Sequence, residues 1–292
     1  MDEAAMEKIC ALLRKGGCRS VHIGGGEPFL DFESLLMVIR KLKKAGITLE
    51  YIETNAFWVS VTSAPGEAVK KLERLLAEGP QTLCISIDPY HAEYVPYGAP
   101  LALAGLCGKI GMDYFLWRNA FIPFLSSLDK QKAHSRAEME SSLGRDYIHK
   151  IAKAYGVGYG GRAVNIERDF GALFPIENFT ADNTPCRSLL STGHFHVDMY
   201  AYFIPPGCTG IRLPLIEVVD DIPADKYPAF EALYSGGIFA LFNLALQHGF
   251  PAAAEAYPSK CNLCFHLRRF LAGKGFLELD REHYEEALKY WE

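Results

Sequence analysis

Strand-like and helix-like segments alternate along residues 1–180, and this alternation constrains the fold more than any other feature of the sequence. Short β-branched or aromatic runs predict strands, and apolar residues at helical spacing predict helices between them. Strands joined by helices form right-handed crossovers in a parallel sheet, so the sequence predicts an α/β fold. The predicted strands are Ser20–Gly24, Thr48–Asn55, Thr82–Pro89, Met112–Asn119 and Gly158–Glu167, and the predicted helices are Glu3–Arg14, Asp31–Lys44, Glu67–Ala77, Pro100–Gly111 and Tyr147–Tyr155.

The length of this series suggests how the sheet closes. A complete eight-unit barrel takes about 250 residues, whereas the alternation occupies residues 1–180. We therefore expect a partial (β/α)5–6 barrel of the TIM type.

The alternation of strands and helices ends near Phe179, and we place a domain boundary near residue 180. His194–Cys208 predicts a β-hairpin, and a Pro-rich linker and an apolar helix over Ala229–Gln247 follow it. A last helix is expected after Asp280, which suits an N-cap. Residues 181–292 should therefore form a small extension built from a hairpin and helices.

Charge and hydropathy exclude several classes of partner. The chain has 30 basic and 35 acidic residues, a formal net charge of −5, which does not favour binding to nucleic acid or to an anionic membrane. Its amino terminus lacks the features of a secretory signal, and the most apolar segment, Gly236–Phe250, is shorter than the roughly 20 residues of a membrane-spanning helix. We expect a cytoplasmic protein, in which the eight cysteines are thiols or metal ligands.

Glycine and polar residues stand where the predicted strands end. Gly24–Pro28 follows the first strand, Glu53–Asn55 ends the second, Ser86–Asp88 ends the third and Arg118–Asn119 ends the fourth. Ligands of parallel α/β sheets bind at the carboxyl ends of the strands, and glycine lets them approach the main chain. A tight turn alone also explains three glycines, but polar residues at successive strand ends favour a ligand site. A phosphate site is disfavoured, because Glu27 would place negative charge beside the anion.

These strand ends resemble the motifs of radical S-adenosylmethionine enzymes. The match covers GGEP at Gly25–Pro28, ETN at Glu53–Asn55, SIDPYH at Ser86–His91 and GGRAVNI at Gly160–Ile166. The resemblance implies that the GGEP backbone holds the amino group of S-adenosylmethionine, that the second and third strand ends line its carboxylate and ribose, and that the Arg162–Val164 backbone flanks its adenine. The cofactor-binding residues so implied are Gly25, Gly26, Glu27, Pro28, Glu53, Asn55, Ser86, Asp88 and Arg162.

One defining motif of that family is absent from the sequence. In the family, a Cys-x3-Cys-x2-Cys loop after the first strand binds three irons of a 4Fe-4S cluster. No such triplet occurs here, and the chain starts at the position of the family's first helix; Cys10 and Cys18 are expected to be thiols packed beside that helix. The cluster that binds S-adenosylmethionine would therefore require a further N-terminal segment.

The resemblance also implies a reaction. The family cleaves S-adenosylmethionine reductively to a 5′-deoxyadenosyl radical, which abstracts a hydrogen atom from the substrate. An electron donor protein is the implied partner, and a peptide or protein is the implied substrate. Because no cluster cysteines stand beside the sulfonium, we expect this chain alone to be inactive.

Four further cysteines form a second candidate site. Cys186 precedes the predicted hairpin, Cys208 ends it, and Cys261 and Cys264 form a Cys-x-x-Cys pair. Four thiolates match the coordination number of either zinc or an iron-sulfur cluster, and the residues alone slightly favour zinc. The arrangement is also similar to the SPASM or twitch extension of radical S-adenosylmethionine enzymes, which implies an auxiliary 4Fe-4S cluster. In the hairpin turn, Ala201 stands where that extension often has glycine.

A second hypothesis explains the same residues without catalysis. The chain would then be a degenerate barrel that binds a peptide or a small molecule, and the four cysteines would hold a structural zinc ion that stabilises the fold. The remaining candidates, His194, His196, His266, Cys84 and Cys107, are expected to be solvated or core residues, although His266 could replace a ligand.

Overall fold

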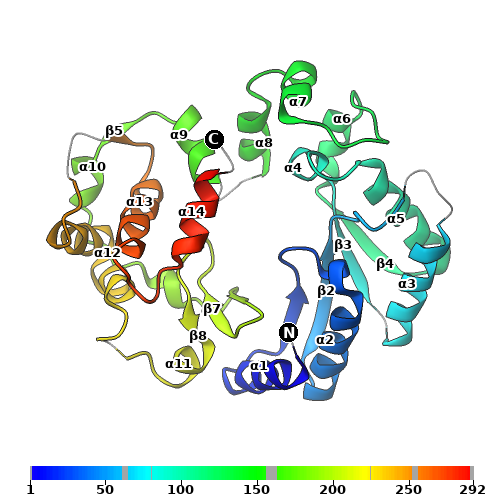
Figure 1. Cartoon of the computed structure of the whole chain (residues 1–292), viewed down its shortest axis with the longest axis horizontal. Helices are drawn as coiled ribbons and strands as arrows, with labels where there is room; N and C mark the ends of the chain where they lie inside the picture. The colour runs from blue at the N-terminus through cyan, green and yellow to red at the C-terminus, as the bar shows by residue number, and fades with distance from the viewer. Residues whose placement is uncertain are drawn as a thin grey trace. The chain divides into compact units, whose positions relative to one another are not determined.

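A computed structural model describes residues 2–60, 65–79, 81–155, 163–223, 225–251 and 256–289 (Figure 1). The chain divides into two compact units, Met1–Tyr147 and Ile148–Glu292. The division therefore falls earlier in the chain than the compositional change near residue 180. In the following, unit 1 and unit 2 denote these two parts.

The alternation of helices and strands predicted for unit 1 is confirmed. The predicted strands and helices match observed ones closely, and the structure adds short helices after the third and fourth strands. In chain order the elements are α1 (Glu3–Lys15), β1 (Ser20–Ile23), η1 (Pro28–Asp31), α2 (Phe32–Ala45), β2 (Thr48–Thr54), α3 (Gly66–Ala77), β3 (Thr82–Ser86), α4 (Pro89–Ala92), α5 (Gly98–Ile110), β4 (Asp113–Trp117), η2 (Asn119–Phe121), α6 (Ile122–Leu125) and α7 (Arg136–Leu143).

The central sheet of unit 1 has four parallel strands in the sequential order β1-β2-β3-β4. Helices α2, α3 and α5 connect them, and right-handed crossovers between sequential strands place all three helices on the same face. Buried side chains between these helices and the sheet form the core of the unit: Leu36, Ile39, Ile52, Leu72, Leu83, Ile85 and Leu103. A parallel α/β fold is thus observed, with four strands and no closed barrel in the described part of the chain.

Local signals in the sequence set the ends of α1 and α2. The Asp2 carboxylate accepts a hydrogen bond from the Ala5 amide at 2.8 Å and so caps α1. Gly46, with φ 68°, ends α2 in the left-handed conformation that favours glycine. The chain can therefore turn directly into β2.

Unit 2 contains the predicted hairpin. Strands β6 and β7 pair antiparallel, and β8 joins them in a three-stranded sheet. The elements are α8 (Tyr147–Tyr155), which begins at the boundary, α9 (Val164–Phe170), β5 (Phe174–Pro175), α10 (Glu177–Thr180), η4 (Arg187–Leu190), β6 (His196–Val197), β7 (Tyr202–Ile204), β8 (Leu213–Pro214), α11 (Leu215–Asp220), α12 (Pro228–Gln247), β9 (Ala256–Tyr257), α13 (Lys260–Ala272) and α14 (Arg281–Lys289).

The predicted fifth strand, Gly158–Glu167, is wrong in the part that the structure describes. Val164–Glu167 is the start of helix α9, while residues 156–162, including Arg162, lie outside the described residues. Val164 and Ile166 alternate with polar residues, a pattern that suggests a strand over so short a run. The side-chain amide of Asn262 donates to the Val164 carbonyl at 2.9 Å, so a contact remote in sequence fixes this turn.

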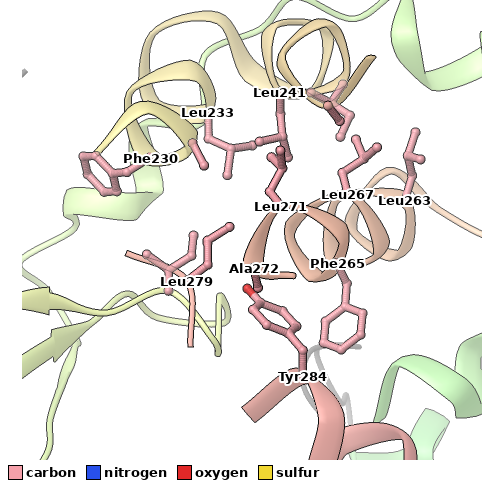
Figure 2. Close-up of a cluster of buried hydrophobic side chains, with 14 of the residues drawn as sticks. Phe230, Leu233, Leu241, Leu263, Phe265, Leu267, Leu271, Ala272, Leu279 and Tyr284 are labelled. Carbon is pink, nitrogen blue, oxygen red and sulfur yellow. The ribbon is translucent and has the colours of Figure 1, made fainter. Parts of the chain in front are cut away.

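The core of unit 2 lies between α12, α13 and α14 (Figure 2). Side chains from α12 pack against α13, and Tyr284 of α14 lies against the opposite side of α13. The buried residues shown are Phe230, Leu233, Leu241, Leu263, Phe265, Leu267, Leu271, Ala272, Leu279 and Tyr284.

Helix α12 is a core helix with a break. Among the described residues, it is the one helix long and apolar enough to cross a membrane by length and composition. Its backbone leaves the helical conformation at Gly237, where φ is 62° and a Cβ atom would collide with the Thr184 carbonyl. Neither half approaches the roughly 20 residues of a membrane span, and Leu233 and Leu241 are buried in the unit 2 core.

The amino-terminal end of α12 depends on a buried carboxylate. Glu278 is 0% exposed, and its Oε1 atom accepts hydrogen bonds from the amides of Ala229 (2.7 Å) and Phe230 (3.4 Å). These amides have no partner within their own helix, because they lie in its first turn. Burial raises the pKa of the Glu278 carboxyl. The side chain therefore caps α12 from a segment 49 residues away.

We predict that Glu278→Ala lowers the free energy of unfolding by about 3 kcal/mol, because two buried amides lose their acceptor. Glu278→Gln keeps an acceptor oxygen and should lose less, and the exposed control Glu282→Ala should stay within about 0.5 kcal/mol. Because its pKa is raised in the folded state, the protonated Glu278 carboxyl stabilises the fold fully below pH 4.5, which is its unfolded pKa. This stabilisation is lost as pH rises through the folded pKa. Denaturant titrations at several pH values should show this loss in the wild type and not in Glu278→Gln. Equal pH slopes in both proteins would contradict the assignment.

Candidate functional site

The loop after β1 is tied to the end of β2 by Glu27. Its Oε1 atom accepts hydrogen bonds from the Phe29 amide (3.1 Å) and the Thr54 hydroxyl (2.9 Å), and its Oε2 atom accepts one from the Asn55 amide (2.8 Å). The Glu27 side chain is thus used by the chain itself. It holds the GGEP backbone at the carboxyl edge of the sheet, and Pro28 begins helix η1 directly after it.

The three glycines before Glu27 meet two separate requirements. A Cβ atom on Gly24 would lie 2.5 Å from Oε2 of Glu53, so only glycine permits the Glu53 carboxylate to approach this strand end. Gly25 and Gly26 have φ values of 76° and 57°, in the left-handed region. The glycines therefore form the turn and also make room for an acidic side chain from the next strand.

Side-chain hydrogen bonds of Thr54 and Asn55 hold the turn that follows β2. The Thr54 hydroxyl accepts hydrogen bonds from the Ala56 amide and from Nε1 of Trp58, both at 3.0 Å. Asn55 accepts from the Phe57 amide through Oδ1 at 2.9 Å. The predicted site residue Asn55 thus has a local role in this turn.

The end of β3 carries a buried acid paired with a histidine. Asp88 is 1% exposed; its Oδ1 accepts from the His91 amide at 3.0 Å, and its Oδ2 lies 2.8 Å from His91 Nδ1. Burial by itself lowers the pKa of His91. The hydrogen bond and charge of Asp88, together with the charges of Glu27 and Glu53, outweigh burial and raise it. Acids from three successive strand ends therefore act on one imidazole.

Glu53 has the most accessible carboxylate of this group. Its side chain is 40% exposed, and Oε1 lies 3.5 Å from Nε2 of His22 on β1. The His22 ring stacks on Tyr51 at 4.7 Å between centroids, and Tyr51 meets Phe115 of β4 edge-on at 5.5 Å. Because side chains alternate along a strand and Ile52 faces the core, these groups lie on the sheet face opposite α2, α3 and α5. This face combines negative charge with aromatic rings.

The structure thus brings together much of what the sequence predicted for this edge. Glu27, Glu53 and Asp88 converge, and Ser86 lies partly buried at the end of β3, in register with Trp117. It adds two histidines that were not among the predicted cofactor residues, His22 and His91. The Asp-x-x-His spacing after β3, which allows Asp88 to cap α4, was the available signal for His91. The remaining predicted residue, Arg162, lies outside the described residues.

The four predicted metal ligands gather in one region of unit 2. Cys186 directly precedes η4, Cys208 lies between β7 and β8, and Cys261 and Cys264 occupy the first turns of α13. Burial raises the pKa of the Cys208 thiol to about 12, and the charges of the other three cysteines add to this. All four are thiols without disulfide bonds, and each lies within electrostatic range of the others.

The donor set has the chemistry of a metal site, but the part of the chain that the structure describes shows no metal-binding geometry. Among the described residues, no group of three or more His, Cys, Asp or Glu side chains is arranged so that it could hold an ion. Four thiols from separated segments nonetheless provide the ligand number and type that tetrahedral zinc and 4Fe-4S clusters use.

The other residues considered from the sequence fall mostly in the cores. Cys84 and Cys107 are buried in unit 1, and Cys10 is buried on α1, as expected. His266 packs against the Tyr257 ring at 5.6 Å. Ala201 adopts φ 64° in the hairpin turn, which explains why glycine suits this position.

Comparisons with protein-family models, with curated proteins and with solved structures give no match for this chain.

We predict that His91 titrates above its ordinary pKa of 6.5, because Asp88 stabilises the imidazolium. Asp88→Asn should lower this midpoint, since burial is then opposed only by the charges of Glu27 and Glu53. NMR titration of the imidazole signals measures both values, and the midpoints of the other histidines should not move. An unchanged His91 midpoint in Asp88→Asn would show that the pair does not form in solution.

Proposed function

We propose that unit 1 binds S-adenosylmethionine at the carboxyl edge of its sheet and that the chain is a partial barrel of the radical S-adenosylmethionine type. The observation that carries the proposal is the convergence of Glu27, Glu53 and Asp88 from three successive strand ends. The sequential strand order supports the barrel interpretation, because a (β/α) barrel also has parallel strands in sequential order and all its helices on one face of the sheet.

The chemistry of this edge suits the ligand. S-adenosylmethionine carries a sulfonium and an ammonium group, and Glu53 offers a partly exposed carboxylate to a cation. The rings of Phe115 and Trp117, both partly exposed on β4 of the same sheet, provide surfaces for a cation or an adenine ring. The glycine turn lets the ligand approach the backbone that Glu27 holds in place.

The role of each part follows from this proposal. With a reduced 4Fe-4S cluster beside it, S-adenosylmethionine supplies a 5′-deoxyadenosyl radical for hydrogen abstraction. The printed sequence has no Cys-x3-Cys-x2-Cys loop, so we propose that this chain alone binds the cofactor without cleaving it. A cytoplasmic location, an electron donor protein and a peptide or protein substrate belong to the same proposal.

Isothermal titration calorimetry of the full chain with S-adenosylmethionine tests the site. We expect Glu53→Gln to weaken binding at least tenfold, because the cation loses its counter-charge, while Glu50→Gln, on the opposite face of the same strand, should bind like the wild type. S-adenosylhomocysteine, which lacks the sulfonium charge, should bind more weakly than S-adenosylmethionine. Absence of wild-type binding, or equal affinities for Glu53→Gln and Glu50→Gln, would contradict the proposed site.

We further propose that the four cysteines of unit 2 hold an auxiliary 4Fe-4S cluster, and structural zinc is the alternative. Their convergence from three separate parts of the chain supports a metal centre of either kind. If zinc is bound instead, the non-catalytic binding hypothesis gains support, because zinc has no redox role.

Metal analysis of the anaerobically purified and reconstituted chain distinguishes these centres. We expect about four irons with matching sulfide per chain, whereas one zinc in a colourless protein would favour the alternative. Cys261→Ser should lose most of the metal in either case. Cys18→Ser, which changes a partly buried thiol of unit 1, should retain it. Wild-type protein without metal would contradict both forms of the centre.

A further inference from the structure

Arg268 places a buried positive charge beside the cysteines of unit 2. It lies on α13 one helical turn after Cys264 and is 3% exposed. Its Nη1 atom donates hydrogen bonds to the Thr209 carbonyl and to the Tyr284 hydroxyl, both at 2.8 Å. The guanidinium also lies within electrostatic range of the Cys264 and Cys208 thiols. Figure 2 shows Tyr284 lying against α13 from α14.

This cation has no carboxylate partner in the described part of the chain. An arginine does not lose its proton in a protein, so burial cannot neutralise it. A buried charge without a counter-charge costs several kcal/mol, and a carbonyl and a hydroxyl compensate only part of this. The buried position of Arg268 therefore calls for an anion nearby.

The four cysteines can supply that negative charge only when they are deprotonated to thiolates. Neutral thiols carry no charge, whereas four thiolates around a zinc ion or around an oxidised 4Fe-4S core leave a net charge of about −2. Lys260, a cation next to Cys261 on α13, is paired with Asp182 at 2.8 Å, and Arg187 next to Cys186 is exposed. Arg268 is thus the buried cation positioned to balance a thiolate centre.

We infer that Arg268 is a positioning residue that acts as the counter-cation of the cysteine-bound metal centre, one helical turn from its ligand Cys264. This inference rests on the proposed metal centre and adds a residue outside its ligand set. Arginine suits the role because it stays charged and its guanidinium donates to the Thr209 carbonyl and the Tyr284 hydroxyl at once, which a lysine ammonium does less well. Residues that support metal ligands from outside the ligand set typically change metal affinity 10- to 100-fold when removed.

The first test measures metal affinity in the full chain. Wild type, Arg268→Gln, Arg268→Lys and Arg269→Gln are titrated anaerobically with zinc chloride against a chelator and, separately, reconstituted with ferrous iron and sulfide. Arg268→Gln should bind zinc 10- to 100-fold more weakly, Arg268→Lys should recover part of the loss, and Arg269→Gln, an exposed neighbour on α13, should match the wild type. If iron is bound, Arg268→Gln should also give a more negative midpoint potential, because a positive charge near the cluster is lost.

The second test separates a charge-balancing role from a merely structural one. Without metal the Arg268 charge is uncompensated, so Arg268→Met should be as stable as the wild type or more stable in chelator. With metal, the order should reverse. Thermal unfolding with and without zinc measures this crossover.

The outcomes distinguish this inference from the proposed centre. Equal metal affinity of Arg268→Gln and wild type overturns the inference alone. Loss of stability or failure of Arg268→Met to fold even without metal shows a structural role and also overturns it. Absence of metal binding in both the wild type and Arg269→Gln overturns the proposed centre and the inference together.

Discussion

The sequential order of the four parallel strands is the constraint on which the candidate ligand site depends. Because every crossover is right-handed and connects neighbouring strands, α2, α3 and α5 all cover one face of the sheet. The opposite face carries Glu53 and the aromatic rings of β2 and β4. The same winding brings all strand carboxyl ends to one edge, so residues from separate motifs meet there without any further device.

Carboxylates at that edge divide into those used by the fold and one left partly exposed. Glu27 and Asp88 accept hydrogen bonds from the chain itself, and each fixes the backbone that follows its strand. Glu53 approaches the first strand through the space that Gly24 leaves and stays 40% exposed. Glu27 and Asp88 thus position the loops, while the accessible Glu53 gives the edge its negative charge.

In unit 2, two buried ionisable side chains lack an opposite charge in the described residues. The cost of burying them is reduced in different ways. Glu278 faces the first amides of α12, and its carboxyl can also take up a proton, which its raised pKa favours. Arg268 has no neutral form to adopt. It is buried near the Cys264 and Cys208 thiols, so in the proposed metal centre its charge would be balanced by thiolates.

The sequence by itself determined the elements of unit 1, since apolar periodicity and the helix stop at Gly46 act locally and are confirmed. It also indicated the polar strand ends and the four cysteines that converge in unit 2. Only the tertiary structure decided that Val164–Glu167 is helical, where a hydrogen bond from Asn262 acts across the chain. The same holds for the buried charges: no local pattern marks Arg268 or Glu278, because their roles depend on partners such as Thr209 and Ala229 that lie dozens of residues away and meet them only in the packed core.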